Sequence, residues 1–129
     1  MKRKLTFVLV AVAILAFGVS SVALAAAGVA GTYTTTIKSP AQLKGKWAIT
    51  FAKSGKYTVA VNGETVARGK YSATAKSVTL FREQGSGCTG AGTYAWKKSG
   101  KTMTFVRKRE ASSCPARALV LGHRFTQVR

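Results

Sequence analysis

The chain of 129 residues has no aspartate and only three glutamates, Glu64, Glu83 and Glu110, against 21 lysines and arginines. The sequence therefore lacks the paired carboxylates that general acid–base catalysis, a Ser-His-Asp arrangement or a magnesium site requires. One histidine, His123, and two cysteines are too few to build a convincing zinc centre. We therefore expect a protein that is not an enzyme and that needs no metal or other cofactor.

The first 27 residues have the layout of an export signal. A positive start, MKRK, precedes an unbroken apolar run over residues 5–17, and small residues then offer A-x-A cleavage sites that end at Ala25 and Ala27. An uncleaved membrane anchor is the alternative, because the apolar stretch up to residue 30 is long enough to span a bilayer. We expect cleavage, which leaves residues 28–129 as one domain, secreted or held outside the cytoplasm at the cell surface or in the periplasm.

The two cysteines, Cys88 and Cys114, lie in the loop-like stretches QGSGCTGAG and EASSCPA. An exported chain meets an oxidising compartment, where two such cysteines are best interpreted as one disulfide. A free reactive thiol is the alternative, but no basic cluster with a histidine lies at a fixed spacing to support it.

Alternating apolar and polar residues recur along residues 28–129 and predict an all-β fold. The turns between the alternating runs are short, among them Asn62-Gly63, so neighbouring strands must pair antiparallel. A long meander keeps two exposed edges unless it closes, which favours an up-and-down barrel over a sandwich of two sheets. A short helix is expected at residues 116–121. The expected strands number about eight and cover residues 31–37, 45–52, 56–62, 65–73, 77–83, 92–98, 101–107 and 122–128.

A glycine precedes an aromatic residue by two positions at five places, for example Gly55 before Tyr57. Each pair lies at or within an expected strand, where glycine permits the tight entry or kink of a narrow barrel. Core packing of these aromatic side chains is one interpretation, and an aromatic-lined cavity is the other. The candidate ligand-binding aromatics are Trp47, Tyr57, Tyr71, Tyr94, Trp96 and Phe105.

The sequence Gly45-Lys46-Trp47, which opens a strand, resembles the glycine-x-tryptophan signature of the lipocalin and calycin barrels. The order of strands, glycines and two cysteines over most of residues 28–129 resembles small secreted bacterial lipocalin-like proteins. The resemblance implies a lipocalin-like barrel, in which the tryptophan closes one barrel end and a late arginine packs across it. Arg117 and Arg124 are the candidates for that arginine, and either is also a candidate partner for an anionic head group of a ligand.

Removing Lys2, Arg3 and Lys4 with the leader leaves 18 basic and three acidic side chains, a net charge of +15. The leading functional expectation is a non-catalytic binding protein whose barrel holds a small apolar or amphipathic ligand. The alternative is a basic scaffold that binds an anionic cell-envelope polymer or an acidic protein as an inhibitor; a surface that is merely soluble is the third interpretation. Specific nucleic-acid recognition is not expected, because the aromatic residues fall at inward positions and few remain to stack on bases.

Overall fold

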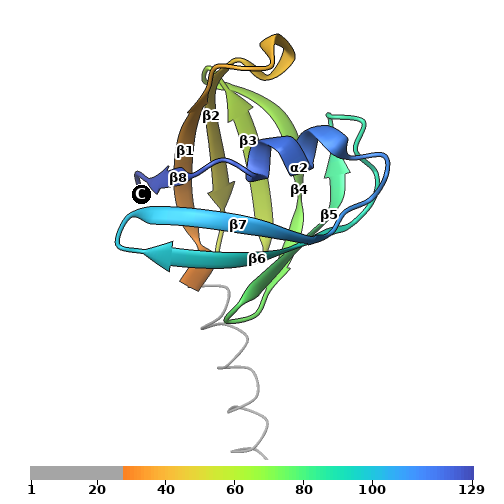
Figure 1. Cartoon of the computed structure of the whole chain (residues 1–129). Helices are drawn as coiled ribbons and strands as arrows, with labels where there is room; N and C mark the ends of the chain where they lie inside the picture. Colours follow the sequence, from red (N-terminus) through yellow and green to blue (C-terminus); the bar gives the residue numbers. More distant parts are fainter. Residues whose placement is uncertain (1–27) are drawn as a thin grey trace, which may run out of the picture.

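A computed structural model describes residues 28–129 as eight antiparallel strands around a closed barrel (Figure 1). Each strand pairs with the next in the chain, and β8 returns to pair with β1. The predicted up-and-down barrel is therefore confirmed. The predicted signal peptide, residues 1–27, lies outside the described residues. The strands are β1 (Gly31–Ile37), β2 (Gly45–Phe51), β3 (Lys56–Val61), β4 (Glu64–Ala73), β5 (Ser77–Gln84), β6 (Gly92–Ser99), β7 (Thr102–Arg109) and β8 (Phe125–Gln127).

Two short helices interrupt the strands. The expected helix is present as α2 (Pro115–Leu121), which begins with a proline in its first turn, the position where its missing N–H is not needed. It occupies the chain just before β8, so that strand starts at Phe125 and not at residue 122. The 3-10 helix η1 (Ala41–Leu43) was not expected, since three residues are too few to show a helical period.

The turns follow their sequence signals. Asn62 and Gly63 connect β3 to β4 with φ angles of 51° and 85°, as a two-residue hairpin turn with a right-handed strand twist requires. The Asn62 side chain also accepts a hydrogen bond of 2.9 Å from the Lys46 amide, which joins this hairpin to the start of β2.

The barrel closes through the three residues of β8. Thr126 lies opposite Thr34 of β1 on one side and opposite Thr102 of β7 on the other. The Thr32 amide adds a hydrogen bond of 3.0 Å to the carbonyl of Arg129. Closure gives every strand a paired neighbour on each side, which limits the open edges that make sheets prone to aggregate; on β7 the pairs with β8 are at Thr102 and Met103.

Aromatic side chains fill a large part of the barrel interior. The Phe51 ring packs at right angles on Tyr71, with 5.0 Å between the ring centroids, and also contacts the rings of Tyr33, Tyr57 and Phe105. The Phe105 ring in turn packs edge-on against Phe125. Most of the six candidate ligand-binding aromatics are therefore packed in the core.

Cys88 and Cys114 form the predicted disulfide, with 4.9 Å between their Cα atoms. The bond ties the residue before α2 to the loop that follows β5. In the described part of the chain, no helix has both the length and the apolar character to cross a membrane.

Candidate functional site

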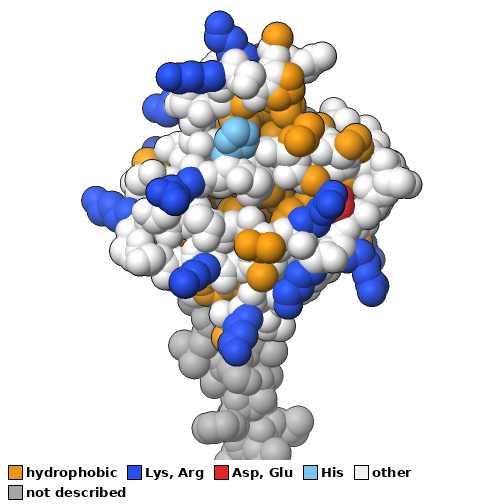
Figure 2. Space-filling model, viewed as in Figure 1, with side chains coloured by type: hydrophobic (Ala, Val, Ile, Leu, Met, Phe, Trp, Pro, Cys, Tyr) orange, Lys and Arg blue, Asp and Glu red, His pale blue; other side chains and the backbone are white. Residues whose placement is uncertain are grey.

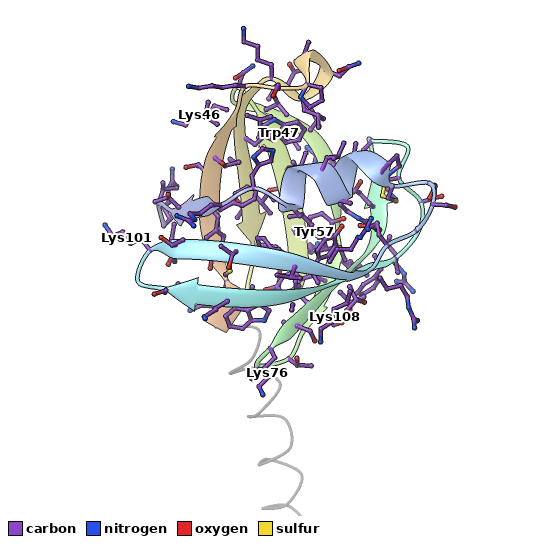
Figure 3. All side chains as sticks on the ribbon, in the orientation of Figure 1. Lys46, Trp47, Tyr57, Lys76, Lys101 and Lys108 are labelled. Carbon is purple, nitrogen blue, oxygen red and sulfur yellow. A yellow bond between two sulfur atoms is a disulfide. The ribbon has the colours of Figure 1, made fainter. Side chains whose placement is uncertain are left out.

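A cavity of about 140 Å³ lies between α2 and the inner surfaces of β2, β3, β4 and β5. Its size is comparable with an engineered apolar cavity of about 150 Å³ that binds benzene. Most of its wall is hydrocarbon. The apolar lining side chains include Trp47, Ile49, Val59, Ala67, Leu80, Val120 and Leu121. In Figure 3, Tyr57 lies at the centre of the barrel close to α2, and Trp47 lies toward the end that carries Lys46.

The sequence of α2 explains why this helix covers the cavity. Arg117, Val120 and Leu121 are buried and share one side of the helix at i, i+3 and i+4, while Ala116 and Leu119 are exposed. The disulfide at Cys114 holds the residue before the helix, and Gly122 ends it. The helix therefore turns two apolar side chains and one arginine toward the barrel interior.

The cavity opens to solvent beside the first turn of α2. The lining residues Ser113, Pro115 and Ala116 on one side, and Val66 and Ser86 on the other, are all exposed. The opening therefore lies between the start of the helix and the segment around the end of β5.

One wall of the cavity is polar and is organised by Arg117, whose side chain is only 6% exposed. Its Nε and Nη2 donate to the two carboxylate oxygens of Glu110, the first over 2.9 Å, and Nη2 also donates to the Gly90 carbonyl over 2.8 Å. Tyr94 donates its hydroxyl to the same carboxylate, and the amide of Ala111 donates to it over 2.9 Å. This bidentate geometry is the strongest that a guanidinium forms with a carboxylate.

The third guanidinium nitrogen faces Glu83, the only other carboxylate near Arg117. Nη1 lies 3.8 Å from Glu83 Oε1, which is too long for a hydrogen bond, and it is buried without a partner. Glu83 instead accepts hydrogen bonds from the hydroxyl of Tyr57, over 2.6 Å, and from the hydroxyl of Ser86. Glu83, Tyr57 and Ser86 line the cavity, whereas Glu110, Tyr94 and Gly90 do not. Nη1 is therefore the guanidinium nitrogen on the cavity side.

Burial and hydrogen bonding determine the protonation states of the two tyrosines, Glu110 and Arg117. Burial raises the pKa of the Tyr57 and Tyr94 hydroxyls well above 10, and their bonds to Glu83 and Glu110 raise it further. Burial alone would raise the pKa of Glu110, but the hydrogen bonds from Arg117, Tyr94 and the Ala111 amide outweigh it and lower that pKa. Burial would likewise lower the pKa of Arg117, yet Glu110 and Glu83 raise it above its ordinary value. At neutral pH both tyrosines therefore remain neutral donors beside a charged arginine and a charged Glu110.

The structure brings three of the predicted ligand-binding residues to the cavity and places the others elsewhere. Trp47, Tyr57 and Arg117 line it. The rest have other contacts: Tyr71 donates to the Ala52 carbonyl, Tyr94 supports Glu110, Trp96 donates to the Thr74 carbonyl, Phe105 lies in the core, and Arg124 is exposed.

The lipocalin resemblance implied that Arg117 or Arg124 packs across Trp47. The Trp47 indole donates to the Leu43 carbonyl over 2.7 Å, and the guanidinium of Arg117 pairs with Glu110. A carboxylate is the better partner for a guanidinium, because it offers two charged acceptors in matching geometry. Lys98 over the ring of Tyr33 is the cation–π contact found within residues 28–129.

Sequence reasoning missed Glu83 and Glu110 as parts of the site. Strict alternation from Val78 and Leu80 would place Arg82 inside the barrel and Glu83 outside. Arg82 instead has a φ of 52°, and the β4–β5 register shifts by one residue between Arg68 and Lys70. This bulge turns Glu83 inward. The sequence did contain one indication of the site. Acidic residues are rare in this strongly basic chain, and two of the three flank the segments that carry the cysteines.

No family model matches the chain, and neither the curated proteins nor the solved structures include a match to it. No group of three histidine, cysteine or acidic side chains within residues 28–129 is arranged to hold a metal ion.

Proposed function

We propose that this chain is an exported, lipocalin-like binding protein that holds a small, mainly apolar molecule in the cavity beneath α2 and catalyses no reaction on it. The observation that carries the proposal is the cavity of about 140 Å³, apolar over most of its wall and open to solvent at one side. Binding sites for small molecules are typically concave and apolar with a few placed polar groups. The disulfide and the signal-like leader support export.

The cavity volume limits what the barrel can hold. A space close to that of a benzene-binding cavity accepts one ring, a short branched chain or one end of a longer molecule. The packed aromatic core around Phe51 closes the rest of the interior. The cavity is therefore too small for the bulky ligands that fill a roomy barrel.

Replacing Ala67 by leucine should abolish binding by filling the cavity. The Ala67 side chain is 4% exposed on β4 and lines the cavity, so three added carbon atoms would occupy the ligand's space. We expect the affinity for toluene, measured by NMR titration of backbone amides, to fall at least about tenfold. Overpacking should cost about 1 to 3 kcal/mol of stability, which thermal unfolding would report.

The control is Ala48→Leu, which adds the same atoms to β2 at a position that alternates with the inward Trp47 and Ile49. It should leave toluene binding unchanged. Equal toluene affinity in wild type and Ala67→Leu would show that the ligand does not occupy this cavity.

A second function is favoured by how the charges are distributed. Glu83, Glu110 and Arg117 are turned inward with side chains 4% to 6% exposed, while the other 17 lysines and arginines of residues 28–129 are all exposed. Glu64 is the one exposed acidic residue in the same range. Lys46, Lys76, Lys101 and Lys108 project from different parts of the barrel (Figure 3), and basic side chains are spread over much of the visible face in Figure 2.

Such a surface supports binding to a polyanion, such as an anionic polymer of the cell envelope. Retention on immobilised dextran sulfate should be strong at low salt and be lost as screening increases toward about 1 M salt. Absence of retention even at low salt would remove this second candidate and leave the cavity function standing.

A further inference from the structure

We infer that the cavity selects a ligand that carries a hydroxyl group beside Glu83 and rejects a ligand that carries a carboxylate. The inference rests on the proposed function and names the chemical class of its ligand. It reverses the expectation that Arg117 would bind an anionic head group. The reasons are the charge of the polar wall and the hydrogen-bonding capacity left unused there.

The buried cluster of Glu83, Glu110 and Arg117 beside the cavity has a negative formal charge, although the protein is strongly basic. Arg117 and Glu110 neutralise each other through two hydrogen bonds. Glu83 lies 3.8 Å from Arg117 Nη1, an ion pair without a hydrogen bond, and one cation with two carboxylates carries a formal charge of −1. A carboxylate in the cavity would add a third negative charge to a cluster that holds one positive charge. Repulsion between like charges is strong where side chains are shielded from water.

The unused hydrogen-bonding capacity fits a hydroxyl. The two oxygens of a carboxylate offer about four acceptor positions, and Tyr57 and Ser86 fill two of those on Glu83. Nearby, Arg117 Nη1 is a buried donor without a partner, 3.8 Å from Glu83 Oε1. A hydroxyl donates one hydrogen and accepts others, so the same group satisfies both Glu83 and Nη1. A carboxylate has no hydrogen to give Glu83, and a hydrocarbon satisfies neither.

The test compares three probes of one-ring size: toluene, benzyl alcohol and benzoate. Each is titrated into the purified protein at neutral pH, and amide chemical shifts of the cavity residues are followed. Benzyl alcohol should bind at least about tenfold more tightly than benzoate, because it makes a hydrogen bond to a charged group where benzoate meets repulsion. Toluene should fall between them.

The matched variants are Glu83→Gln and Glu64→Gln, which change the net charge equally. Glutamine at position 83 keeps a carbonyl acceptor for Tyr57 but removes the negative charge from the cavity, whereas Glu64 is exposed at the start of β4. The disadvantage of benzoate relative to toluene should be largely lost in Glu83→Gln and should persist in Glu64→Gln.

The outcomes distinguish failure of this inference from failure of the proposed function. Benzoate binding as tightly as benzyl alcohol to the wild-type protein, or an equal gain for benzoate in both variants, would overturn the inference and leave the cavity function intact. If none of the probes binds, toluene included, the proposed function itself fails. Should Glu83→Gln not fold, the ranking of the three probes on the wild-type protein still decides the inference.

Discussion

Replacing Arg117 by methionine is expected to lower the free energy of unfolding by about 3 to 5 kcal/mol, the cost of removing one partner from a buried ion pair. Glu110 and Glu83, with side chains 4% and 5% exposed, would lose the guanidinium that lies between them. Methionine retains the apolar length of the arginine stem, so the loss would come chiefly from the unpaired carboxylates. Urea unfolding followed by tryptophan fluorescence measures the difference.

Arg124→Met is the control for this prediction. Arg124 is exposed, so its replacement should change stability by no more than about 0.5 kcal/mol. Combining Arg117→Met with Glu110→Gln should recover part of the loss, because the second change removes the charge that the first leaves unpaired. A loss below about 1 kcal/mol in Arg117→Met, the range of exposed ion pairs, would contradict the buried network described above.

Replacing both Cys88 and Cys114 by alanine is expected to cost about 3.5 kcal/mol of stability in the chain-entropy description of a disulfide. The bond joins residues separated by 26 positions, and its removal lets the unfolded chain explore many more conformations. Both cysteines are buried, so alanine avoids placing a new polar group there. The measurement is urea unfolding of the double variant beside the oxidised wild type.

The disulfide also bears on the cavity, because both cysteines line it and Cys114 directly precedes α2. Toluene affinity should therefore weaken in the double variant under conditions where it remains folded. Reduced wild-type protein serves as the control and should lose a similar amount of stability. Unchanged stability in both would show that the 26-residue connection contributes no constraint.

The barrel was predictable from the sequence because its determinants are local. The alternation of Trp47, Ile49 and Phe51 places one side of β2 inside, and the structure buries Ile49 and Phe51 as expected. The dipeptide Asn62-Gly63 predicted a hairpin, and the turn has the expected backbone geometry. Because most connections are short, neighbouring strands pair antiparallel, and closure gives every strand a neighbour on each side.

The site was less predictable, because it depends on a departure from the local pattern. A bulge at Arg82 reverses the direction of the next side chain, and no spacing rule for a regular strand would place Glu83 inside the barrel. The role of Arg117 depends in turn on Glu83 and Glu110, which lie 34 and 7 residues away along the chain.

The alternation of residues along a strand predicts which side chains point inward, but it does not predict where a cavity remains between them. Tyr57 and Tyr71 both follow a glycine by two residues and both point inward. Tyr57 lines the cavity, whereas Tyr71 packs on Phe51. The difference comes from where α2 crosses the barrel, which depends on tertiary packing and on the disulfide.

The central claim, an apolar space beneath α2 that accepts a small molecule, is tested most directly by a crystal structure of the protein under xenon pressure. Xenon enters apolar cavities irrespective of the natural ligand. We predict a xenon site among Ile49, Leu80 and Val120, between α2 and the strands that face it. Side chains packed together across this space, with no xenon between them, would contradict the claim and leave the exposed basic surface as the basis of function.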